Sequence, residues 1–171
     1  EIAALARRFS IGQVELRAVS ERMDLPRLFT EKFRDAGTMS QWLADQEIGI
    51  CSLDSSAKLV GCAPEARQEL LDFAEWAHAL GVPGIRVFDG GKFEPQLDAE
   101  VRREAIDFLT WWQDKKESQG WKVDLIIETH DALCTAAHCL DLAEHAPTPV
   151  HILWDAHHTW RKAGEDPMKT W

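Results

Sequence analysis

Two apolar stretches of this chain each run directly into acidic and histidine side chains that could bind a metal ion or move a proton. They are Ile126-Ile127-Glu128-Thr129-His130-Asp131 and Leu153-Trp154-Asp155-Ala156-His157-His158. Carboxylate oxygens and imidazole nitrogens are ligands suited to Mg²⁺, Mn²⁺, Co²⁺ or Zn²⁺. Neither stretch contains a cysteine thiolate, so nothing here favours a structural zinc site. The repeated pattern therefore indicates a divalent metal site, provided that both stretches end at the same place in the fold.

Alternating helical and strand-like segments are expected to position these residues. Apolar spacing and capping signals predict helices over 1–9, 26–46, 64–81, 98–118 and 132–145, and strands over 14–17, 48–53, 85–88, 124–128 and 150–155. We expect the second helix to be interrupted at Gly37 and to restart at Ser40. Strands separated by helices of this length run parallel with right-handed crossovers. Two α/β architectures fit, an open doubly wound sheet and an arc of a (β/α)8 barrel.

In both architectures the chemistry belongs at the carboxyl ends of the strands. Polar residues collect at the end of every predicted strand, among them Glu15, Asp54 and Arg86. Neighbouring parallel strands lie about 4.8 Å apart, so strand-end carboxylates at Glu128 and Asp155 can share one cation. Glu128 is expected on the strand face of Ile126, which we take as a core residue. An alternative interpretation is that the two carboxylates cap the following helices or pair with Arg86.

Composition narrows the class of protein. The 171 residues predict a single domain over 1–171. A formal net charge of −10 opposes a non-specific grip on nucleic acid or an anionic membrane surface. The chain shows neither an apolar run of about 20 residues, which a membrane span needs, nor the residue order of a signal peptide. Four scattered cysteines are typical of reduced thiols, and we expect a cytoplasmic protein.

Four short strings lie at or near the ends of predicted strands. They are Val14-Glu15-Leu16-Arg17, Gly84-Ile85-Arg86-Val87-Phe88 before Gly90-Gly91, Ile127-Glu128-Thr129-His130, and Trp154-Asp155-x-x-His158. In their order and spacing over essentially the whole chain, these strings resemble the sugar phosphate isomerase/epimerase family of the xylose-isomerase-like TIM barrel superfamily. The Asp-x-x-His string is the most specific of the four.

The resemblance implies a divalent metal (Mn, Mg, Co or Zn) and a role for each strand-end residue. Glu128 and Asp155 match the first two metal ligands, and His158 matches a histidine that approaches the metal and contacts substrate oxygens. Glu128 would also be one member of the catalytic acid–base pair. Arg86 and Glu15 match positions that face the cavity, and we add His130 to these expected substrate-binding residues. The implied reaction is isomerisation or epimerisation of a small sugar or sugar phosphate by proton transfer through an enediolate.

By this resemblance the five strands correspond to strands 2–6 of the barrel. A complete (β/α)8 barrel takes about 250 residues, so we expect a truncated barrel with outer helices. Such a chain would bind metal weakly without turning over, and assembly with a second copy could complete it. Alternatives are a polyol dehydratase with the same site, an endonuclease IV-like nuclease, and a barrel without activity that serves as a binding module. The nuclease is disfavoured because the expected third- and fourth-strand ends, Ser52-Leu53-Asp54 and Phe88-Asp89, lack histidine.

Overall fold

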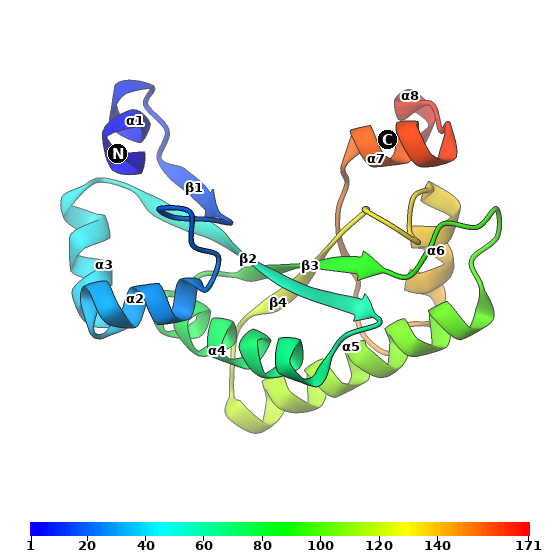
Figure 1. Cartoon of the computed structure of the whole chain (residues 1–171), viewed down its shortest axis with the longest axis horizontal. Helices are drawn as coiled ribbons and strands as arrows, with labels where there is room; N and C mark the ends of the chain where they lie inside the picture. Colours follow the sequence, from blue (N-terminus) through cyan, green and yellow to red (C-terminus); the bar gives the residue numbers. More distant parts are fainter. The chain divides into compact units, whose positions relative to one another are not determined.

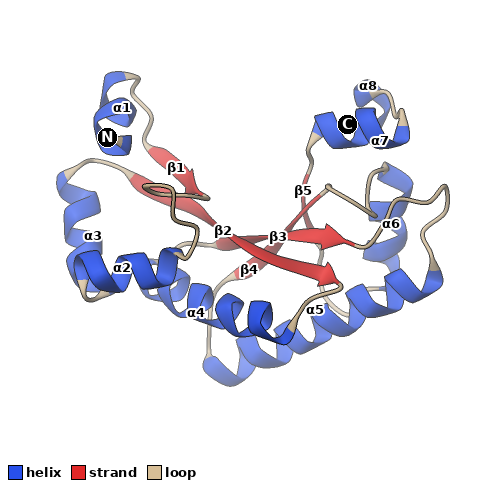
Figure 2. Cartoon of the chain, viewed as in Figure 1, coloured by secondary structure: helices blue, strands red, loops and turns tan.

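The computed structural model describes all residues from Glu1 to Trp171, with eight helices and five strands. Figures 1 and 2 show the elements along the chain. In order they are α1 (Ile2–Arg8), β1 (Gln13–Leu16), α2 (Leu25–Phe33), α3 (Ala36–Asp45), β2 (Gly49–Val60), α4 (Pro64–Leu80), β3 (Gly84–Gly90), α5 (Ala99–Gln119), β4 (Asp124–Glu128), α6 (Ala136–His145), β5 (His151–Leu153), α7 (Ala156–Ala163) and α8 (Pro167–Thr170).

The five strands form one sheet in the order β1-β2-β3-β4-β5. β1 pairs with β2 in parallel, with Leu16 opposite Leu53. β4 pairs with β5 in parallel, with Glu128 opposite Leu153. Strands that are neighbours in the sheet are thus also consecutive in the chain, and helices separate them. This arrangement confirms the predicted α/β class with a parallel sheet.

The chain divides into two compact units, and both contain part of the sheet. The first comprises Glu1–Ser55, Gln68–Ile85 and Trp121–Asp124, and the second comprises Ser56–Arg67, Arg86–Gly120 and Leu125–Trp171. Large apolar side chains such as Phe73 in the first unit and Phe108 in the second are fully buried. A single domain over 1–171 stays a prediction. None of the helices combines the length and the apolar character that crossing a bilayer requires.

The second strand is twice as long as expected, which corrects the placement of Asp54. We predicted a strand over 48–53 with Asp54 at its end, but β2 continues to Val60 and Asp54 is buried within it. The Asp54 carboxylate accepts a hydrogen bond from Ser52 Oγ at 3.3 Å. Burial of Ala57 and Leu59, with Lys58 exposed between them, continues the alternation of a strand. A polar residue satisfied inside a strand was mistaken for the end of that strand.

Helix boundaries also differ from the prediction where side chains cap the backbone. The break between α2 and α3 lies at Arg34 (φ +72°) and Asp35, whereas Gly37 and Ser40 belong to α3. The Asp35 carboxylate accepts the backbone N–H of Thr38 at 2.8 Å and so begins the new helix. In the same way, α6 begins after its N-cap Thr135 and not at residue 132. Helices α7 and α8, which we did not predict, follow β5.

Gly90 ends β3 in a conformation that a side chain would prevent. Its φ is +69°, and an added Cβ would lie 2.3 Å from the carbonyl oxygen of Val60. Only glycine allows this close backbone approach without a shift. The tight contact fixes the end of β3 and with it the neighbouring residue Asp89.

Candidate functional site

Glu128 is the last residue of β4, and the strand turns it away from the apolar core. Leu125 and Ile127 are buried, whereas Ile126 and Glu128, on the opposite face, are half-buried. The prediction that Glu128 and Ile126 share a face is consistent with this alternation. The prediction that Ile126 is a core residue is wrong, because Leu125 and Ile127 are the residues of β4 that are buried in the core. The half-buried face of β4 therefore presents a carboxylate.

Asp155 and His158 lie at the start of α7, directly after β5. The Asp155 carboxylate caps the helix: its Oδ1 accepts the backbone N–H of His157 at 2.7 Å and that of His158 at 3.4 Å. The other oxygen, Oδ2, lies 3.5 Å from His158 Nε2. The backbone N–H of Asp155 donates to Thr129 Oγ1 at 2.8 Å, which ties this turn to the end of β4.

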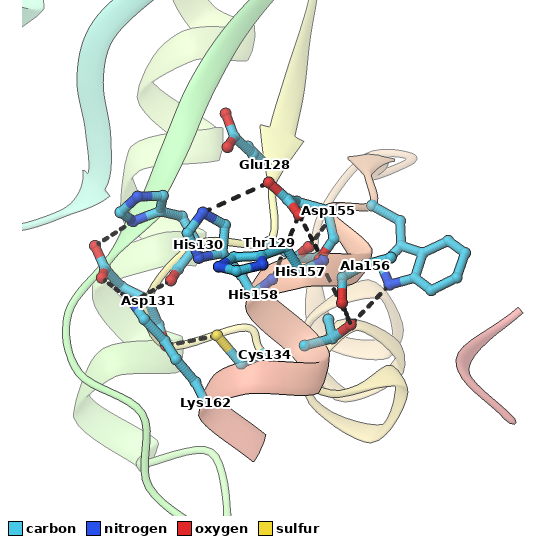
Figure 3. Close-up of polar contacts among 12 residues, drawn as sticks. Glu128, Thr129, His130, Asp131, Cys134, Asp155, Ala156, His157, His158 and Lys162 are labelled. Carbon is cyan, nitrogen blue, oxygen red and sulfur yellow. Dashed lines mark hydrogen bonds and ion pairs between the residues drawn. The ribbon is translucent and has the colours of Figure 1, made fainter. Parts of the chain in front are cut away.

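These three side chains converge. One donor atom from each of Glu128, Asp155 and His158 lies within 4.8 Å of the others. Figure 3 shows the three side chains and the contact between Asp155 and His158. Two carboxylates and an imidazole are a donor set typical of divalent cations. The residues present therefore fit a metal ion. The capping of α7 by Asp155 does not conflict with that fit, since Oδ2 stays directed at His158.

Arg86 forms a buried ion pair with Glu128. Its Nε lies 3.0 Å from Glu128 Oε2, and the two side chains are 5% and 14% exposed. The guanidinium group also lies over the ring of Phe88, 4.1 Å from its centroid. The alternative interpretation of the sequence, in which Glu128 pairs with Arg86 and Asp155 caps a helix, thus describes real contacts that coexist with the convergence.

His130 lies beside the group formed by Glu128, Asp155 and His158. Its ring centroid lies 4.3 Å from that of His158 and 4.8 Å from that of Phe88. Its Nδ1 lies 3.1 Å from Asp131 Oδ2. Glu15, by contrast, is an exposed residue of β1 in the first compact unit, opposite Ser52 in the strand register. Its substrate-binding role stays a prediction.

A second group of acidic and histidine side chains was not foreseen as a cluster. Asp89, His130 and Asp131 offer donor atoms within 4.8 Å of one another. Asp89, which is buried, accepts the backbone N–H groups of Asp131 (2.7 and 2.9 Å) and Leu133 (2.6 Å). Burial raises the pKa of Asp89 although these N–H groups act against it. Because its oxygens are already engaged by the backbone, we assign Asp89 to loop structure and not to metal binding.

His130, Cys134 and His138 recur every four residues, but they do not form a set of metal ligands. Cys134 Sγ donates to the carbonyl oxygen of Asp131 at 3.1 Å, and His138 Nδ1 lies 2.9 Å from that of Ala132. Burial raises the pKa of Cys134 to about 11 and that of Cys139 to about 12, so both thiols stay protonated at neutral pH. All four cysteines are free.

Comparison with known proteins finds likeness in structure and none in sequence. No protein-family profile matches the chain, and no curated protein matches it. A probable 3-DHS dehydratase, AsbF, involved in petrobactin synthesis in Bacillus anthracis, superposes with a TM-score of 0.77 at 18% identity, over 99% of this chain and 61% of that one. The IolI protein with a bound zinc atom gives 0.70 at 16%, over 95% and 59%. D-allulose 3-epimerase from Methylomonas sp., in complex with D-allulose, gives 0.65 at 15%, over 94% and 57%.

These likenesses confirm the predicted fold, that of the xylose-isomerase-like TIM barrels. The chain spans about six tenths of the length of these three structures. A family 2 AP endonuclease from Brucella melitensis has the same fold, with a TM-score of 0.67. The fold therefore does not choose among isomerase, dehydratase and nuclease chemistry, and the side chains of the site must carry that argument.

Proposed function

We propose that the chain carries part of the active site of a metal-dependent isomerase or epimerase that acts on a small sugar or sugar phosphate. The observation that supports this most directly is the convergence of Glu128, Asp155 and His158 on one point. A zinc-bound structure and a ketose-bound epimerase among proteins of this fold are consistent with it.

In this proposal Glu128 is both a ligand and a proton-transfer group. Arg86 engages one oxygen, Oε2, and thereby fixes the orientation of the carboxylate. A carboxylate so held can accept the proton next to a substrate carbonyl. His158, whose Nε2 faces Asp155 Oδ2, would contact substrate oxygens. A bound divalent cation would supply electrostatic stabilisation of the enediolate charge.

A dehydratase acting on a cyclic polyol is the second candidate. The supporting observation is the carboxylate of Glu128, which Arg86 holds at 3.0 Å and which could serve as the base, and a probable 3-DHS dehydratase is among the proteins of this fold. Both reactions begin with removal of a proton next to a carbonyl group, so both require the same base. They differ in the next step, since only the dehydratase expels a hydroxyl group.

Titration of the purified chain with Mn²⁺, Co²⁺ and Zn²⁺, followed by calorimetry, tests the metal site. Glu128→Gln keeps the size of the side chain and removes its charge, and we expect it to weaken binding by about tenfold or more. Glu144→Gln, on the exposed side of α6, is the matched control and should bind as the unmodified chain does. Equal metal affinity in Glu128→Gln and the unmodified chain would count against the proposal.

Exchange in D₂O separates the two candidate reactions. Metal-dependent exchange of the proton next to the carbonyl of a ketose without loss of a hydroxyl group, followed by NMR, is expected for an isomerase or epimerase. Formation of a conjugated product with new ultraviolet absorption indicates the dehydratase.

A further inference from the structure

Lys162 connects α7 to the loop that follows Glu128. Its ammonium group donates to the backbone carbonyl oxygen of His130 and lies 2.7 Å from Asp131 Oδ1. Lys162 and His158 are four residues apart on α7 and therefore share a face of the helix. The side chain thus joins the element that carries one donor to the loop beside another, as Figure 3 shows.

The partner of Lys162 is itself fixed. Asp89 holds the backbone of the loop by accepting the N–H groups of Asp131 and Leu133. Partial burial raises the pKa of Asp131, but the contacts with Lys162 and His130 outweigh that effect and lower it overall. The carboxylate therefore stays ionised at neutral pH. Lys162 consequently binds a loop whose backbone is held in place by Asp89.

Two contacts hold α7 against the segment that follows β4. The backbone N–H of Asp155, the N-cap of α7, donates to Thr129 Oγ1 at 2.8 Å. Lys162, one turn beyond His158, bridges α7 and the loop at His130 and Asp131. The first contact lies at the N-terminus of α7, so a rotation of the helix about it would carry His158 away from Glu128. The second contact opposes that rotation.

We propose that Lys162 is a positioning residue that keeps His158 within cation-binding distance of Glu128. This inference rests on the proposed function, because it assumes a cation at that site. A protonated lysine has three donors and no acceptor, so Lys162 does not itself supply a ligand atom. Its action is transmitted through the orientation of α7. The affinity and geometry of the metal site therefore depend on a salt bridge that lies outside the ligand set.

Cobalt binding to the full chain tests this inference. Lys162→Met keeps most of the stem and removes the charge, and we expect about tenfold weaker Co²⁺ binding. The visible absorption spectrum of bound Co²⁺ should also change, because it reports the arrangement of ligands and not the stability of the fold. Arg161→Met, the adjacent exposed cation on α7, is the control and should preserve both affinity and spectrum.

Asp131→Asn provides a second route that approaches the same salt bridge from the loop. We expect it to weaken Co²⁺ binding similarly, and the double variant with Lys162→Met should lose little more, since both changes break one interaction. Unchanged affinity and spectrum in both single variants, while Glu128→Gln loses the metal, would overturn the positioning role and leave the proposed function standing. Absence of Co²⁺ binding by the unmodified chain would overturn the proposed function, and this inference with it.

Discussion

The buried pair of Arg86 and Glu128 shows how one carboxylate meets two requirements. A carboxylate at the end of a strand, 14% exposed, needs a partner for its charge. Arg86 supplies that partner at 3.0 Å and is itself held over the ring of Phe88. Within a binding site the pair also fixes which way the carboxylate faces. Stability and the proposed function thus depend on the same contact.

Removal of Arg86 alone should therefore be costly. Arg86→Met leaves Glu128 charged in partly buried surroundings, and breaking such a pair costs about 3–5 kcal/mol of unfolding free energy. We expect the double variant Arg86→Met/Glu128→Gln to recover part of that loss, because no unpaired charge remains. Urea unfolding followed by tryptophan fluorescence measures both values.

An exposed arginine provides the comparison. Arg103, 69% exposed and paired with Glu100 on α5, should cost less than about 1 kcal/mol when replaced by methionine. A loss in Arg86→Met no larger than that in Arg103→Met would show that the buried pair is not an important source of stability.

Among the elements, the loop between β4 and α6 carries the residues closest to Glu128. It has no regular structure from Thr129 to Thr135, and Asp89 at the end of β3 organises it by accepting backbone N–H groups. A carboxylate is needed there because both of its oxygens can accept. An amide in the same place would direct its NH₂ group at another donor.

Asp89→Asn should accordingly destabilise the loop. Leaving a buried N–H group unsatisfied costs about 1–3 kcal/mol, and we expect a loss of that size in unfolding free energy. Hydrogen exchange at the backbone amides of Asp131 and Leu133 should speed up as well. Asp107→Asn on the exposed side of α5 is the control. Unchanged protection of both amides would contradict the role of Asp89.

The strength of a local pattern determines how well each element could be predicted. The apolar period of α4 and α5 and the short apolar strand β4 were foreseen within a residue or two, because burial repeats over their length. We predicted the end of strand β2 too early, because a charged residue such as Asp54 is usually exposed and so resembles the end of a strand. Its burial depends on contacts that are not local, including the hydrogen bond from Arg17 to its carbonyl oxygen.

The same limit applies to the site. The convergence of Glu128, Asp155 and His158 could be predicted because each lies at or just after the end of an apolar strand and because the family resemblance ordered them. Lys162 and Asp89 could not be identified in this way. Their contacts join residues 31 to 44 positions apart, and nothing in the neighbouring sequence signals the partner. Residues that support a site depend on tertiary packing more than those that form it.

At the scale of the whole molecule, net charge and exposed apolar side chains have opposite effects on association between copies of the chain. Ten large apolar side chains are exposed, and the first four lie within residues 2–11. They are Ile2, Leu5, Phe9, Ile11, Met23, Trp42, Leu140, Trp160, Met168 and Trp171. Exposed apolar side chains favour association. A net charge of −10 opposes it at neutral pH by mutual repulsion between copies.

Association should therefore increase as the pH falls toward the isoelectric point of about 5.1, where the repulsion disappears while the apolar side chains stay exposed. We expect light scattering to rise steeply between about pH 6 and pH 5, and added salt at neutral pH to raise it modestly by screening the charge. Phe9→Ser, which removes a side chain that is 62% exposed, should reduce the rise without changing the isoelectric point. Scattering that is strongest at alkaline pH and low salt would contradict this balance, because charge repulsion is greatest under those conditions.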